Sequence, residues 1–164
     1  MGEDRQQKIV VGVGRSPASA AALSWAAAEA RLRRARLYVV RVWDPARHVA
    51  PYACVGALPT CDEERAAAFR DLAAVMRTEF GPVPPDDVTA ELAEGVPERV
   101  LVQRSAGADL LVLGVAAAVW PDGGSPGPVV RACVARARCP VVVIGGAGAA
   151  PALAGQAMAD SAAR

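Results

Sequence analysis

The sequence is expected to fold as an α/β domain built on an open, parallel β-sheet. Short runs of apolar residues recur along the chain, and two of them, residues 110–113 (LLVL) and 141–144 (VVVI), are unbroken, as strands covered on both faces should be. Longer segments with apolar residues at helical spacing alternate with these runs. Strand and helix alternate up to a fifth strand, and right-handed crossovers then place helices on both faces of one sheet.

The first strand and helix have the clearest local signals. Residues 8–13 are apolar almost throughout, which predicts a central strand. Ser16 is a good N-cap, and Pro17 suits the first helical position, where no N–H group is missed. A helix is therefore expected from this point to about Arg34.

The second strand is expected over residues 37–43 and carries a charged residue. Arg41 indicates either that this strand lies near a sheet edge or that its side chain faces a cleft. An irregular segment, residues 44–59, follows the strand. Segments of this length are usually functional or mobile, but the sequence assigns no role to this one.

A capping box and an alternating stretch define the middle of the chain. Thr60 and Glu63 predict the start of a helix that ends at Gly81. Its inner face is expected to carry five apolar side chains, namely Phe69, Leu72, Val75, Met76 and Phe80. Residues 88–93 alternate between apolar and polar types, which predicts an edge strand with one wet face.

The last third of the chain contains the candidate binding region. A short helix that begins at Pro97 precedes a buried strand, residues 110–113. The loop 114–127 then leads to a short helix and to the last strand, residues 141–144. Ligands of open parallel sheets bind at the carboxyl ends of strands and near helix N-termini, so this loop is where a ligand is expected.

Composition limits the partners of the chain. Its 164 residues, 53% of them hydrophobic, are enough for one domain with a sizeable core. A formal net charge of +1 gives no overall attraction for nucleic acid, and no apolar run is long enough to span a membrane. We expect a cytoplasmic protein with one domain over residues 8–146 and disordered ends, residues 1–7 and 147–164.

The cysteines predict neither a disulfide framework nor a metal centre. They include no CxxC pair and stand at Cys54, Cys61, Cys133 and Cys139. The first two lie in one loop with His48, and a zinc site there would lack a fourth ligand unless Asp62 or Glu63 served. The last two are expected to be small buried side chains. No metal is therefore expected.

Three segments, taken in order, resemble the universal stress protein (UspA) family. KIVVGVGRSPASAAALSWAAAEA is similar to its opening strand, turn and helix, VPERVLVQRSAGADLLVLG to its third helix and fourth strand, and VVRACVARARCPVVVI to its last helix and strand. The resemblance covers residues 8–144 and implies a Rossmann-like, three-layer fold (adenine nucleotide alpha hydrolase-like) with strand order 3-2-1-4-5. It also implies a homodimer formed through an apolar edge strand that contains Val141, Val142, Val143 and Ile144.

The resemblance also implies a nucleotide site that has lost part of its motif. Family members that bind ATP carry a glycine, two residues, a glycine, nine residues, and a glycine followed by Ser or Thr, together with an acidic residue after the first strand. Gly114 and Gly127 match the first and third glycines, whereas Ala117, Pro128 and Gly14 replace the other three groups. A phosphate cradle needs inward N–H groups and a hydroxyl or a cation. Loss of two or three such bonds weakens binding by about 10²- to 10⁴-fold.

Two functions remain open after this comparison. The candidate site consists of Val13, Gly14, Arg15, Gly114, Gly124, Ser125, Gly127 and Val129, and ATP with magnesium is the cofactor that it would take. The first function is a non-enzymatic stress-response dimer that acts through an unknown protein partner and has a weakened nucleotide site. The second is an ATP-binding sensor, with at most slow hydrolysis, whose occupancy changes its choice of partner.

Three other classes are disfavoured. A dinucleotide-dependent oxidoreductase would need a third glycine after Gly12 and Gly14. A hydrolase would need a nucleophile with an oriented base, but the chain has one histidine and no G-x-S-x-G elbow. A phosphotransfer receiver domain would need clustered carboxylates after the first strand, where Gly14 and Arg15 stand. No catalytic residue is therefore expected.

Overall fold

The computed structural model of the protein describes residues 6–45, 60–115 and 126–145. Strands and helices alternate along this part in the order β1 (Lys8–Val13), α1 (Pro17–Arg33), β2 (Arg36–Trp43), α2 (Cys61–Phe80), β3 (Val88–Glu94), α3 (Pro97–Arg104), β4 (Leu110–Val115), α4 (Pro128–Arg136) and β5 (Val141–Gly145). The strands form one parallel sheet of order β3-β2-β1-β4-β5. The expected α/β architecture and strand order are confirmed.

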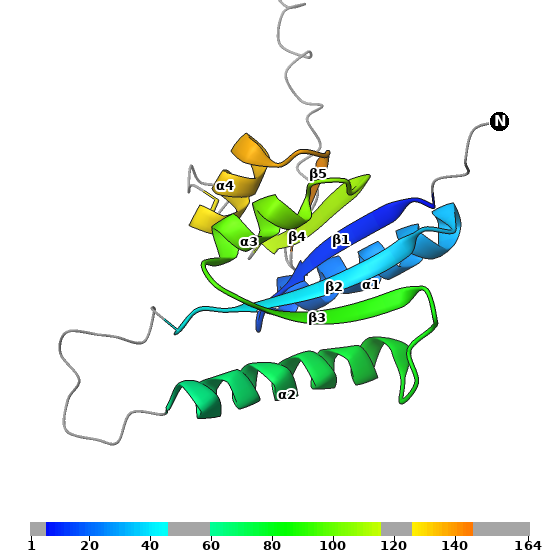
Figure 1. Ribbon diagram of the computed structural model, residues 1–164. Helices are drawn as coiled ribbons and strands as arrows, with labels where there is room; N and C mark the ends of the chain where they lie inside the picture. Colours follow the sequence, from blue (N-terminus) through cyan, green and yellow to red (C-terminus); the bar gives the residue numbers. More distant parts are fainter. Residues whose placement is uncertain (1–5, 46–59, 116–125, 146–164) are drawn as a thin grey trace, which may run out of the picture.

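Helices cover both faces of the sheet, with α3 and α4 side by side on one face and α1 behind the other (Figure 1). β1 lies in the middle, and Ile9, Val10 and Val11 are 0% exposed. Because successive side chains of a strand point to opposite faces, Ile9 and Val11 pack with α1 and α2, whereas Val10 packs with α3 and α4. The central strand therefore contributes side chains to two hydrophobic cores, one on each face of the sheet.

α1 presents small side chains to the sheet. Its buried residues are Ala18, Ser19, Ala22, Leu23, Ala26, Ala27 and Ala30. Ser16 caps the helix, since its Oγ accepts a hydrogen bond from the Ser19 N–H at 3.2 Å, and Pro17 stands at the first helical position. This alanine-rich face lets the axis of α1 come close to the strands beneath it.

α2 runs along the β3 side of the sheet and is lightly anchored (Figure 1). The predicted capping box is present, because Glu63 N–H donates to Thr60 Oγ1 at 3.3 Å and Thr60 N–H donates to Glu63 Oε2 at 2.7 Å. Of its 20 residues only Ala68, Leu72 and Met76 are buried.

The prediction that Phe69 lies on the inner face of α2 is wrong. Leu72 and Met76 are buried, and Val75 and Phe80 pack against the same cluster. Phe69, however, is 61% exposed. Ala68 occupies the inner face at this turn, and the next residue of a helix points about 100° away from it.

β4 is longer than expected. It continues through Gly114 and Val115, which pair with Ile144 and Gly145 of β5. Residue 114 therefore belongs to a strand and not to the loop that follows. The expectations for residues 1–5, for most of the irregular segment after β2 and for the tail concern residues outside the described part of the chain.

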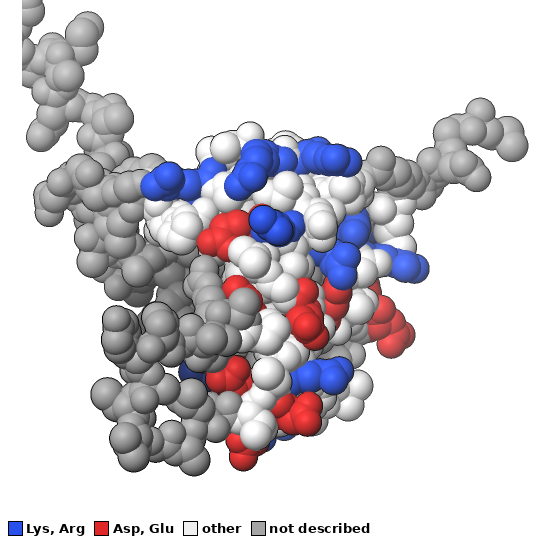
Figure 2. Space-filling view, turned by 60° about the vertical axis from the view of Figure 1, so that its left-hand side comes forward, with Lys and Arg blue, Asp and Glu red and all other residues white. Residues whose placement is uncertain are grey.

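The surface carries charges of both signs. In the view of Figure 2, basic side chains gather toward the top of the face and acidic side chains lie mostly below them. No helix in residues 6–45, 60–115 and 126–145 has the length and apolar character that a membrane span requires.

Candidate functional site

A cleft of about 860 Å³ opens at the carboxyl ends of β1, β2 and β4. Its other walls come from the turn after β1, the N-terminal half of α2, the inner side of α3 and the first turn of α4. The structure brings five of the predicted site residues together here, namely Val13, Gly14, Arg15, Gly114 and Val129. Gly127 lies next to them as the N-cap of α4, and Gly124 and Ser125 are outside the described residues. A cleft of this size suits a small organic ligand.

Gly114 is required by packing alone. A Cβ atom at this position would lie 2.3 Å from the carbonyl oxygen of Ala18 and 2.7 Å from the backbone nitrogen of Ser19. β4 therefore crosses the first turn of α1 at a separation that no side chain allows. The match of Gly114 to the nucleotide motif consequently says nothing about phosphate binding.

Gly14, by contrast, has room for a side chain. A Cβ atom there would lie 3.7 Å from Arg41 Nη1 and 3.9 Å from Ser19 Oγ, which are ordinary contacts. The Gly14 N–H donates to Ser19 Oγ at 2.5 Å and so ties the turn to α1. Packing would therefore allow an acidic side chain at residue 14, although the chain has none there. The guanidinium group of Arg41 lies beside this position.

The start of α4 offers little to a phosphate. Gly127 is the N-cap and has no side chain, and Pro128 is the first helical residue and has neither a hydroxyl nor an N–H group. The next two residues, Val129 and Val130, line the cleft. A Cβ atom at Gly127 would meet nothing within 4 Å, so this glycine is not needed for packing.

Arg41 is the main candidate functional residue whose location the sequence did not decide. β2 lies between β1 and β3, so Arg41 is not on an edge strand, and its side chain faces the cleft and is only 16% exposed. Its Nη1 donates to the Val13 carbonyl oxygen at 3.3 Å. Its Nε is buried and has no hydrogen-bond partner among the described residues.

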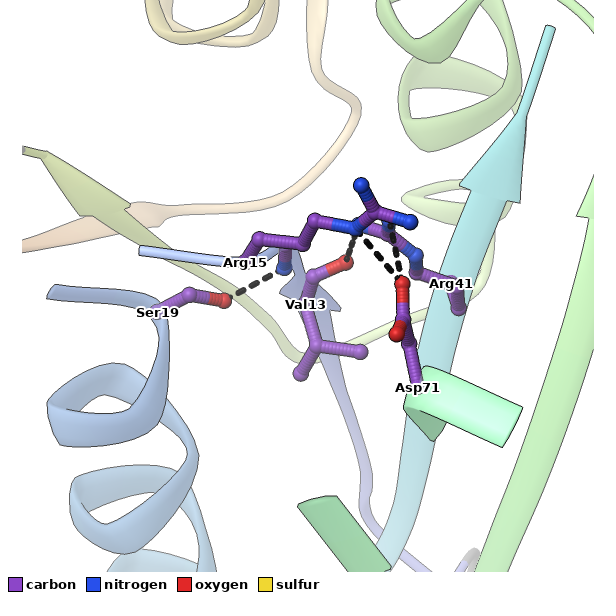
Figure 3. Close-up of polar contacts among 6 residues, drawn as sticks. Val13, Arg15, Ser19, Arg41 and Asp71 are labelled. Atoms are coloured by element: carbon purple, nitrogen blue, oxygen red, sulfur yellow. Dashed lines mark hydrogen bonds and ion pairs between the residues drawn. The ribbon is translucent and has the colours of Figure 1, made fainter. Parts of the chain in front are cut away.

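Arg15 and Arg41 converge on one carboxylate from α2 (Figure 3). Arg15 Nε donates to Asp71 Oδ2 at 2.7 Å, and Arg41 Nη2 lies 3.5 Å from the same oxygen. Burial lowers the pKa of Arg41, the Asp71 carboxylate opposes this shift, and the positive charge of Arg15 adds to it. We call these three side chains the Arg–Asp–Arg cluster. No sequence signal points to Asp71, because it is 56 residues from Arg15 on an exposed helix.

The described residues that line the cleft carry balanced charges. Three of them are arginines, namely Arg15, Arg41 and Arg70, and three are acidic, namely Asp44, Glu63 and Glu64. A ligand with four negative charges would therefore meet as many carboxylates as guanidinium groups. The lining favours a ligand of low charge.

The cysteines in the described part of the chain stand apart from this cleft. Cys133 is 0% exposed, and burial raises its pKa to about 11. Burial also raises the pKa of Cys139, whereas Cys61 is exposed at the start of α2. No group of three or more His, Cys, Asp or Glu residues that could hold a metal occurs among the described residues, and His48 and Cys54 lie outside them.

A model of the universal stress protein family matches residues 6–145. No curated protein matches the chain. Among solved structures, the universal stress protein UspA from Lactobacillus plantarum is 24% identical, with a TM-score of 0.61 over 87% of this chain and 99% of its own. A universal stress protein family member from Burkholderia pseudomallei is 26% identical, with a TM-score of 0.58 over 87% and 98%.

A third solved structure contains a nucleotide. The universal stress protein from Archaeoglobus fulgidus in complex with dAMP is 25% identical to this chain. Its TM-score is 0.58, and the alignment covers 84% of this chain and 97% of that one.

Proposed function

The chain belongs to the universal stress protein family, and on this basis we propose that it is a non-enzymatic, cytoplasmic stress-response dimer whose cleft binds nucleotides weakly. In this proposal it acts through contacts with a protein partner. The observation that carries the weak binding is the start of α4, where Pro128, next to the cleft-lining Val129, offers neither a hydroxyl nor an N–H group.

The balanced charges of the cleft support a ligand with few phosphates. Guanidinium groups approach from the turn after β1, from β2 and from α2, and among the described residues three of them line the cleft together with three carboxylates. The Archaeoglobus fulgidus protein holds a nucleotide with a single phosphate. An adenine mononucleotide is therefore the ligand class that we expect here, and a triphosphate gains nothing from its additional charge.

Calorimetric titration tests this proposal. We expect AMP to bind with a Kd of about 0.1–1 mM and ATP with magnesium to bind no more tightly than AMP. Incubation with ATP should release no ADP above the rate without protein. A micromolar Kd for ATP, or sustained ADP release, would contradict the proposal.

The second candidate function is the ATP-binding sensor. The cleft of about 860 Å³ is large enough for a nucleotide, and Arg15 with Arg41 supplies cations that the loop lacks. This candidate requires occupancy at cellular ATP levels, so the same titration separates it from the first.

The dimer is proposed to form through β5. This strand ends the sheet, and β4 is its only strand neighbour in the described part of the chain. Val141, Val142, Val143 and Ile144 are all half-buried, so pairing with a second copy would cover apolar surface and an open backbone edge.

Charges on β5 test this interface. Because neighbouring strand residues point to opposite faces, Val142→Lys and Val143→Lys place a charge on each face in turn, and we expect both variants to have the mass of a monomer in solution. Val134→Lys is the control, since Val134 is 62% exposed on α4 and should leave the mass of the dimer unchanged. A dimeric mass for both β5 variants would place the interface elsewhere.

A further inference from the structure

The Arg–Asp–Arg cluster already holds one anionic oxygen at the mouth of the cleft. Asp71 Oδ2 lies 2.7 Å from Arg15 Nε and 3.5 Å from Arg41 Nη2. Two guanidinium groups therefore converge on one oxygen atom, as they do around a phosphate or carboxylate ligand.

The two arginines have donors to spare. A guanidinium group carries five N–H donors, of which Arg41 donates one to the Val13 carbonyl oxygen, while its Nη2 lies in an ion pair 3.5 Å from Asp71 Oδ2. Its buried Nε has no partner within the described residues. The side chain is 16% exposed, so it is held in place by β2 and does not sweep through solvent. A buried donor without a partner costs stability, so the guanidinium group of Arg41 is not saturated by its contacts within the described residues.

Asp71 is an easily displaced member of the cluster. It is 35% exposed and belongs to α2, which buries only three residues. The Arg15 side chain is 70% exposed. Ion pairs of this kind contribute little to stability, so an incoming anion can compete with the carboxylate for the two arginines.

We propose that Arg15 and Arg41 form the anion-binding end of the cleft, and that Asp71 occupies this end until the phosphate of a mononucleotide replaces it. The phosphate then lies at β1 and β2 and not at the start of α4. This inference rests on the proposed nucleotide binding for the identity of its ligand, but the anion site itself does not require a base or a ribose.

Comparison of AMP with adenosine isolates the contribution of the phosphate. We expect wild-type protein to bind AMP more tightly than adenosine. In Arg41→Met and Arg15→Met the ratio of the adenosine Kd to the AMP Kd should fall about fivefold, with the Kd of adenosine unchanged. In Asp71→Asn, which removes the competing charge at nearly constant shape, AMP should bind about threefold more tightly than to wild type.

Two controls separate the cluster from general charge effects. Arg77→Met removes an exposed arginine of α2 that does not line the cleft, and should leave the AMP-to-adenosine difference unchanged. Glu79→Gln alters a polar contact between α2 and α1, a hydrogen bond of 2.5 Å from Ser24 Oγ, and should not affect AMP binding. Thermal denaturation shows that each variant is folded, and Arg15→Met, at an exposed residue, keeps the test available if Arg41→Met does not fold.

Each outcome decides one question. If AMP binds wild type but the two arginine variants keep the full AMP-to-adenosine difference, the inference is wrong while the proposed function stands. If neither AMP nor adenosine binds, the proposed function is wrong, and inorganic phosphate titrated into Asp71→Asn then decides the inference. Phosphate binding that the added Arg41→Met substitution abolishes supports the anion site, and no phosphate binding overturns it.

Discussion

Gly114→Ala is expected to destabilise the protein by at least about 3 kcal/mol, because the new methyl group would overlap backbone atoms and not a flexible side chain. The nearest atoms are the carbonyl oxygen and carbon of Ala18, at 2.3 and 2.5 Å. Both belong to the first turn of α1, which cannot move without disturbing the alanine face that packs on the sheet. Relief of the overlap would require β4 and α1 to separate.

Chemical denaturation measures this effect, and two other glycines serve as controls. Gly127→Ala should change stability little, because nothing lies within 4 Å of its Cβ position and its φ of −54° suits any residue. Gly14→Ala should also be tolerated, since the nearest atom lies at 3.7 Å. Equal stability losses at all three positions would show that the separation between β4 and α1 has been misjudged.

Repair of the loop is expected to strengthen ATP binding by about ten- to hundredfold. Ala117→Gly together with Pro128→Ser restores two groups that nucleotide-binding relatives carry, and Pro128→Ser adds both a hydroxyl and an N–H group at the start of α4. A hydrogen bond to a charged group contributes about 1.5–3 kcal/mol, so one or two recovered bonds account for the gain.

Calorimetric titration with ATP and magnesium measures the repair. Pro17→Ser is the matched control, because Pro17 also stands at the first position of a helix, and its replacement adds the same two groups at the start of α1 and not of α4. Unchanged affinity in the doubly substituted protein would mean that the weak binding has a cause other than these two residues.

Local signals predicted the elements well. The apolar run of β1, the Ser16 cap and the Thr60–Glu63 capping box depend on residues a few positions apart, and each is present as expected. The prediction that Phe69 lies on the inner face of α2 was wrong, because helical spacing alone does not show which of two adjacent apolar residues faces the sheet. That choice depends on how α2 is tilted against β2 and β3.

The features of the site that the sequence did not predict depend on contacts between residues that are far apart in the chain. The packing role of Gly114 depends on Ala18, which is far away in the chain. The Arg–Asp–Arg cluster joins a turn, a strand and a helix, and neither the spacing nor the type of its members forms a motif. Arg15 was expected in the site from its place in the turn after β1, and Arg41 gave a signal as a charge in an apolar strand, for which the structure decides between the two explanations.

The tight crossing of β4 over α1 affects how related sequences should be compared. A glycine imposed by backbone contact is expected to persist whether or not a ligand is still bound, because any side chain in its place would force β4 and α1 apart. The first glycine of the motif is therefore a poor guide to whether a homologue has kept its nucleotide. The positions that are free to drift, such as residues 14 and 128, are better indicators.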